Sequence, residues 1–135
     1  MISKIQDRSR LAGGADNRWE IMTGLYREKL TRLISRLDLT ADSRGELDVR
    51  HFFNGAALYA GDIMCASWSP VGLAFRLPVD EVAELIEGGQ AIPLKYFAKG
   101  HVKKGYALLE NPADKSESSL KQLFERAIEQ ASVDA

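Results

Sequence analysis

The residues best suited to chemistry in this chain are one cysteine, Cys65, and two histidines, His51 and His101. A nucleophilic cysteine needs a lowered pKa and a base within hydrogen-bonding reach, so catalysis at Cys65 would require a histidine beside it. Cys65 lies in a β-type run from Ile63 to Trp68, and free cysteine is among the most buried residue types. We therefore interpret it as a small core residue, with a thiol-dependent activity as a weaker alternative.

Strict strand alternation predicts the neighbours that share a face with Cys65. Ile63 and Ser67 fall on its side of the strand, and the opposite side takes Met64, Ala66 and Trp68.

Cys65, His51 and His101, together with a carboxylate, are the best candidates for metal ligands, but their spacing matches no known zinc motif. The chain also has no phosphate loop, dinucleotide fingerprint or nucleophile elbow, since its glycine pairs at Gly13 and Gly88 are isolated. We expect no catalytic residue, no cofactor and no metal, and hence no enzyme. The histidines are interpreted as surface or strand-end side chains.

Four lysines, Lys95, Lys99, Lys103 and Lys104, surround one expected hairpin loop. His101 and two aromatic residues, Tyr96 and Phe97, are interleaved with them. Lysines release counterions from phosphates and aromatic rings stack on bases, so this loop is the best candidate for a nucleic-acid contact. A solvated turn that blunts edge pairing is the alternative that we favour.

The composition indicates one globular domain. Of 135 residues, 45% are hydrophobic and 27% charged, and the net charge of −1 gives no overall attraction to polyanions. One cysteine excludes an internal disulfide, and no apolar run is long enough for a membrane span or signal peptide. We predict a cytoplasmic protein with a mobile leader at residues 1–16 and a single domain at residues 17–135.

Three helices are predicted from capping signals and apolar spacing. Asn17 and Glu20 form a capping box that starts the first helix, which runs to about Leu37. Its predicted apolar stripe comprises Met22, Leu25, Tyr26, Leu30, Leu33 and Leu37. A short second helix follows Pro78, and a third begins near Ser116. The third helix has an apolar face of Leu120, Leu123, Phe124, Ala127, Ile128 and Ala131.

The region between the helices has short β-type runs divided by turn residues. The predicted runs are Leu47–Phe53, Ala56–Tyr59, Ile63–Trp68, Gly72–Leu77, Ile92–Phe97 and Lys104–Glu110. Asn54 breaks the first run, and we expect three antiparallel strands in a meander, with the last two runs as a second strand pair. The fold class is therefore α+β, with a small antiparallel sheet flanked by an N-terminal, a middle and a C-terminal helix.

The stretch RHFFNGAALYAGDIMCASWSPVGLAFRLP, with the later PLKYFAKGHVKKGYALLENP and the closing helix, resembles the N-terminal domain of the TfoX family, also called Sxy. The resemblance extends over about Trp19 to Ala131. The matching signature residues are Arg50, Phe53, Gly55, Leu58, Tyr59, Met64 and Arg76. Asn54, Cys65 and Ala74 depart from the family pattern, where a glycine, an aromatic residue and a tyrosine are usual.

The resemblance implies an α+β, non-enzymatic protein-interaction module associated with the regulation of transcription and competence in bacteria. It also implies a homodimer, and the extra apolar residues of the first helix (Trp19, Ile21 and Ile34) either cover the sheet or form the dimer surface. The protein partner is not identified. An accessory protein that binds nucleic acid through the lysine loop is the alternative. Arg50 and Arg76, expected on neighbouring strands, could bind an anion or, as we favour, pair across strands with Asp48 and Asp62.

Overall fold

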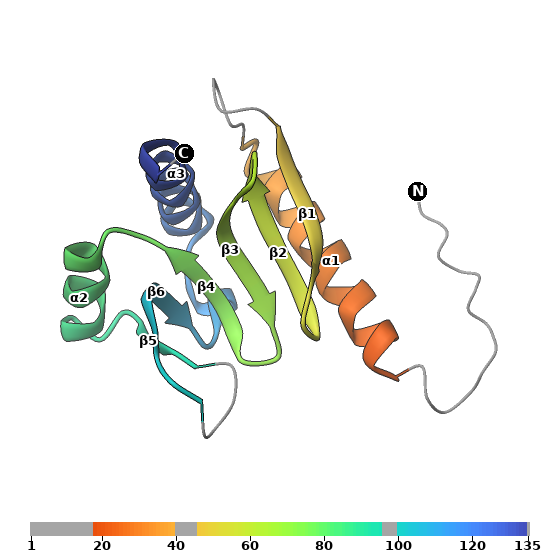
Figure 1. The fold of residues 1–135 in the computed structure, drawn as a ribbon, viewed down its shortest axis with the longest axis horizontal. Helices are drawn as coiled ribbons and strands as arrows, with labels where there is room; N and C mark the ends of the chain where they lie inside the picture. The colour runs from red at the N-terminus through yellow and green to blue at the C-terminus, as the bar shows by residue number, and fades with distance from the viewer. Residues whose placement is uncertain (1–17, 40–45, 96–99, 135) are drawn as a thin grey trace.

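The computed structural model describes residues 18–39, 46–95 and 100–134, with side chains in the first of these ranges described from residue 24. The predicted leader at residues 1–16 and the capping residue Asn17 lie outside these ranges. The described chain contains three α-helices and one six-stranded antiparallel sheet, which confirms the α+β prediction (Figure 1). No helix of the described part is both long and apolar enough to cross a membrane.

The helices and strands follow in the order α1 (Arg18–Arg36), β1 (Leu47–Phe52), β2 (Gly55–Ala60), β3 (Ile63–Ser69), β4 (Gly72–Arg76), α2 (Val79–Glu87), β5 (Ile92–Leu94), β6 (Lys103–Leu109) and α3 (Glu117–Asp134). In space the strands are ordered β1-β2-β3-β4-β6-β5. The predicted second strand pair is thus confirmed, and β6 joins it to β4.

The meander has four strands, so the prediction of three was short by one. The segment after Asn54 forms a full partner for β1, from the pair of Phe52 and Gly55 to the pair of Leu47 and Ala60. The two-residue connection is made possible by Phe53, which adopts a left-handed φ of 53°. The turn residues that were expected only to end the first strand therefore form a tight hairpin between β1 and β2.

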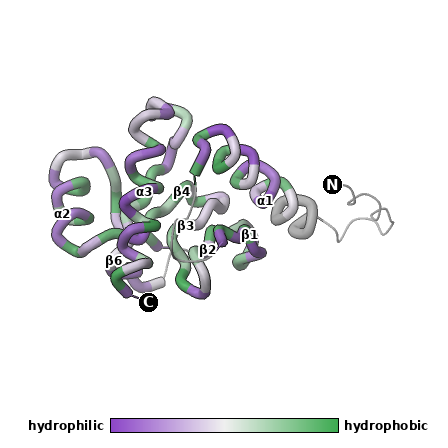
Figure 2. Tube along the Cα trace, turned by 90° about the horizontal axis from the view of Figure 1, so that it is seen from above, coloured by the Kyte–Doolittle hydropathy of each residue, from purple (hydrophilic) through white to green (hydrophobic). Residues whose placement is uncertain are grey.

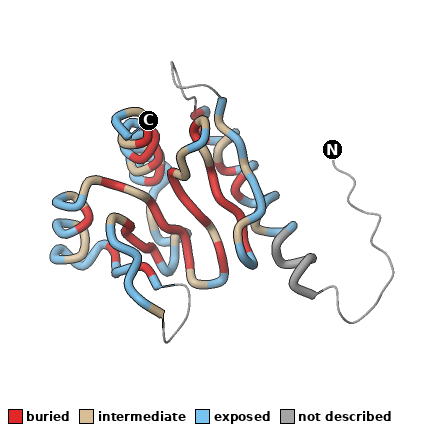
Figure 3. The backbone as a smooth tube through the Cα atoms, in the orientation of Figure 1, coloured by how far each residue is buried: buried red, intermediate tan, exposed pale blue. Residues whose placement is uncertain are grey.

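One face of the sheet is buried under the helices. α1 packs on β1, β2 and β3, while α3 packs mainly on β3 and β4. Figure 2 shows α1 lying on one side of these strands. The largest fully buried side chains of the main core include Phe75 and Phe124. Their rings pack edge to face, with 4.8 Å between the ring centroids. Burial is concentrated in the central strands, as Figure 3 shows.

The predicted apolar face of α3 is confirmed, whereas that of α1 needs one correction. Leu30, Leu33 and Leu37 are buried, but Leu25 is 50% exposed. The side chain of Met22 lies outside the described residues. Leu25 precedes Tyr26 by one residue, about 100° around the helix, and Tyr26 takes the position over the core. The start of α3 is capped by Ser116, whose Oγ accepts a hydrogen bond from the amide of Ser119 at 3.1 Å.

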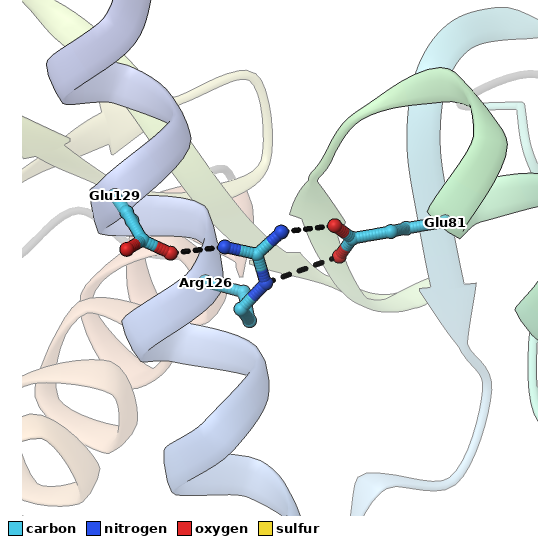
Figure 4. A network of polar contacts seen from close by, with 3 residues as sticks. All are labelled: Glu81, Arg126 and Glu129. Carbon is cyan, nitrogen blue, oxygen red and sulfur yellow. Dashed lines mark hydrogen bonds and ion pairs between the residues drawn. The ribbon is translucent and has the colours of Figure 1, made fainter.

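Ion pairs on the surface join α2 to α3. The guanidinium of Arg126 in α3 donates to both carboxylate oxygens of Glu81 in α2 and to Glu129 one turn further along α3 (Figure 4). Exposed pairs of this kind contribute up to about 1 kcal/mol each, so they orient α2 more than they hold the fold together.

Gly55 gives a direct test of how closely β2 approaches β3. A Cβ atom at this position would lie 2.2 Å from the carbonyl oxygen of Trp68, a contact that backbone atoms cannot relieve. We expect Gly55→Ala to lower the free energy of unfolding by more than about 2 kcal/mol, measured by urea denaturation.

The matched control is Gly24→Ala in α1, because no atom lies within 4 Å of a Cβ built there. It should stabilise the protein by about 0.5–1 kcal/mol through helix propensity. Equal effects of the two substitutions would contradict the packing described for Gly55.

Candidate interaction surface

Cys65 is a core residue, as the sequence predicted. Its side chain is 0% exposed and lies in the main hydrophobic cluster, where Sγ is 3.7 Å from the carbonyl oxygen of Ile63. Burial raises the pKa of the Cys65 thiol to about 11. A thiol with a raised pKa in an apolar site is the opposite of an activated nucleophile.

The predicted faces around Cys65 are right for Ile63 and Met64 but wrong for Ala66, Ser67 and Trp68, because β3 carries a β-bulge. Leu58 lies opposite Ala66 but Tyr59 lies opposite Met64, so Cys65 is the extra residue. The bulge breaks the two-residue alternation. Beyond it Ala66 and Trp68 join Cys65 on the helix side, and Ser67, opposite Ala57, lies on the other face with Met64.

Both histidines are exposed, whereas Cys65 is buried in the core. His51 in β1 is exposed, and its Nε2 accepts a hydrogen bond from Nη1 of Arg27 in α1 at 2.8 Å. Partial burial and then the charge of Arg27 lower the pKa of His51. His101 is exposed beyond the β5 strand, and no group of three or more metal-binding side chains occurs among the described residues.

The structure brings part of the lysine loop together. Leu94 lies opposite Lys103, so Lys95 and Lys103 lie at the same end of the β5–β6 hairpin. Lys95, Lys103 and Lys104 are exposed, and Nζ of Lys103 lies 5.4 Å from the centroid of the Tyr106 ring. Lys99 and the interleaved aromatic residues Tyr96 and Phe97 fall outside the described residues.

Some of the family-signature residues have roles in the fold itself. Phe53 and Gly55 shape the β1–β2 hairpin, and Leu58 is 0% exposed in the core. Arg76 does not pair with Asp62. Its Nη2 lies 2.6 Å from Oδ2 of Asp134, at the end of α3, so this arginine fastens the last helix to β4.

The other signature residues, Arg50, Tyr59 and Met64, meet on the face of the sheet that the helices leave uncovered. The guanidinium carbon of Arg50 lies 4.2 Å from the centroid of the Tyr59 ring, and Met64 is opposite Tyr59 in the sheet. Asp48, also opposite Tyr59, accepts a hydrogen bond from Nε of Arg50 at 2.8 Å. We call Asp48, Arg50, Tyr59 and Met64 the open-face patch. No described helix lies over this face of β1, β2 and β3 (Figures 1 and 2).

The ion pair in this patch differs from the prediction. Asp48 and Arg50 belong to the same strand, two residues apart, whereas we expected Arg50 to pair across strands. Strands β1 and β4 are not neighbours either, so Arg50 and Arg76 form no joint anion site. The spacing of two residues puts Asp48 and Arg50 on one face, and that signal was present in the sequence.

The patch combines charged, aromatic and thioether side chains. The hydrogen bond that Arg50 donates to the carboxylate of Asp48 raises the pKa of Arg50 above its usual range, so Arg50 remains a cation paired with Asp48. The patch therefore joins a stacked cation, an aromatic ring and a flexible thioether. Tyr, Arg and Met are the residue types enriched where proteins meet.

Comparison with known proteins identifies a family. The family model of the TfoX N-terminal domain matches residues 38–131, which include every strand and α2. A search of the curated proteins finds no similar one.

The buried thiol gives one prediction. With a pKa of about 11, the thiolate fraction of Cys65 near pH 8 is about one in a thousand, against about a quarter for a free cysteine. Native protein should react with iodoacetamide at least about a hundredfold more slowly than urea-unfolded protein, as mass spectrometry would show. Equal rates in the two states would contradict the burial of Cys65.

The contact between His51 and Arg27 gives a pH dependence. The folded-state pKa of His51 is lowered, so the unfolded state binds the proton more tightly. The stability from this contact is complete above the unfolded pKa of about 6.5 and is lost as the pH falls below it. Urea denaturation across this range should show a smaller acid-side loss for His51→Gln. If His51→Gln lost as much stability at acid pH as the wild type, His51 would not be the source of the loss.

Proposed function

Because the chain belongs to the TfoX N-terminal domain family, we propose that it is a non-enzymatic protein-interaction module whose contact surface is the open-face patch. The family match supports a competence-related, regulator-like module. In this proposal the module acts in the bacterial cytoplasm, where it affects transcription through a protein partner and without a reaction of its own.

The observation that carries the proposal is the position of Arg50, Tyr59 and Met64. These three signature residues lie outside the main core, in contrast to Leu58, and they come from three adjacent strands to one face. Met64 also packs against a smaller cluster of buried residues on that face. Their side chains are half-buried or exposed, and the ring of Tyr59 is fixed under the guanidinium of Arg50. A rigid aromatic side chain loses little conformational entropy on binding, which suits it as an anchor for a partner.

A second candidate is nucleic-acid binding by the lysine loop. The exposure of Lys95, Lys103 and Lys104 at one end of the hairpin favours it, since each could neutralise a phosphate. Lys103 lies near the ring of Tyr106 and offers the cation at a fixed position. A net charge of −1 gives no long-range support, so such binding would depend on these lysines alone.

The experiment compares three tagged proteins: the wild type, Tyr59→Ala, and the triple variant Lys95→Gln, Lys103→Gln and Lys104→Gln. Each is crosslinked in extract of the source cells, and captured proteins are quantified by mass spectrometry. We expect Tyr59→Ala to lose at least about fivefold of a partner that the wild type enriches, because truncating an anchor costs more than about 1 kcal/mol. The triple lysine variant should retain that partner.

Circular dichroism and thermal unfolding of each variant test whether it is folded. A parallel gel-retardation assay on duplex DNA at low salt tests the second candidate. A partner retained by Tyr59→Ala would contradict the proposed surface. A DNA complex formed by the wild type and lost in the triple variant would favour the nucleic-acid alternative.

A further inference from the structure

The two edges of the sheet differ in how well they could accept another strand. β5, at one edge, has three residues and contains Pro93, which has no amide proton to donate. β1, at the other edge, has six residues, Leu47–Phe52, and contains no proline. Among the described residues no strand pairs with the outer side of β1. The β1 edge is therefore the one suited to strand addition.

The hydrogen-bonding pattern of β1 shows which groups face outward. The pair of Phe52 and Gly55 closes a two-residue hairpin at one end of β1. At the other end the backbone carbonyl oxygen of Glu46 accepts a hydrogen bond from the amide of Gly61. Antiparallel strands alternate hydrogen-bonded and non-bonded positions, so even-numbered residues of β1 bond to β2. The peptide groups of Leu47, Val49 and His51 are then directed to the outer edge.

We propose that this edge binds a second copy of the same chain, with the two β1 strands antiparallel about a two-fold axis at Val49. The two sheets then form one continuous sheet across the dimer. Val49 lies opposite Val49 of the second copy, and Leu47 lies opposite His51 of the second copy. Because the axis is perpendicular to the sheet, both open faces point the same way.

The charges of β1 select this register among the symmetric alternatives. An axis at Asp48 would place two carboxylates opposite each other, and an axis at Arg50 would place two guanidinium groups opposite each other. An axis at Val49 places Asp48 of each copy opposite Arg50 of the other. These are non-hydrogen-bonded positions, where side chains on facing strands are closest and opposite charges stabilise the pairing.

The side chains on the other face of β1 also suit the pairing. Leu47 and Val49 are half-buried against the main core, and a second strand would cover the apolar surface that remains exposed. The inference rests on the proposed interaction role and names one partner, a second copy. It joins the two open-face patches into one surface, because Asp48 and Arg50 belong to both the edge and the patch.

The experiment uses two variants, Asp48→Arg and Arg50→Asp, examined alone and mixed. Each variant alone places like charges opposite each other in the dimer and should weaken self-association at least about tenfold, measured by sedimentation velocity over a concentration series. Mixing the two variants places opposite charges at both pairs again and should restore a dimer. The mixture leaves the ion pair within each strand broken in both proteins, so its recovery reports contacts between copies.

The control is Glu110→Arg, which makes the same charge change as Asp48→Arg but at an exposed position outside the strands. It should dimerise like the wild type. Hydrogen exchange of the wild type needs no variant: the amides of Leu47, Val49 and His51 should become protected as the concentration rises. A monomeric wild type, a dimer that both variants leave intact, or a mixture that stays monomeric would each overturn the proposal.

These outcomes are separable from the test of the proposed function. Tyr59→Ala changes the patch and leaves the charges of β1 intact. Loss of captured partners with an unchanged dimer supports the patch alone, and a monomeric wild type that still captures its partner overturns only the dimer.

Discussion

The alternation of side chains along β2 decides which residues enter the core and which lie on the opposite face. Burying Leu58 under the helices turns Tyr59, the next residue, to the opposite face. The pairing of β2 with β1 and β3 then brings Arg50 and Met64 beside Tyr59. A core residue and a surface residue are therefore fixed by the same strand, and a slip of one residue would exchange them.

The β-bulge in β3 adjusts this alternation without losing the core. The extra residue, Cys65, stays on the helix side with Ala66, while Met64 keeps its place beside Tyr59. An apolar and nearly unreactive cysteine suits a position where two consecutive residues face the core. The lone thiol has a packing role, and the open face carries the residues of the proposed contact.

The sequence predicted most of the fold and less of the surface. Apolar spacing located α3 and its buried face, and turn residues located the strands, because both signals are local. The bulge at Cys65 could not be predicted, since it depends on the register between two strands. The exposure of Leu25 was missed because helical spacing alone does not say which side of a broad apolar stripe meets the sheet. The ion pair of Arg76 with Asp134 could not be predicted, because the two residues are far apart in the sequence and no local pattern relates them.

The open face of β1, β2 and β3 is proposed as a contact surface, and the cysteine behind it as a packing residue of the core. Hydroxyl-radical footprinting of the protein alone and bound to its captured partner tests both parts at once. Oxidation of Met64 and Tyr59 should slow on binding, while Cys65 should stay unoxidised in both states. Equal oxidation of Met64 and Tyr59 with and without the partner, or rapid oxidation of Cys65 in the free protein, would contradict it.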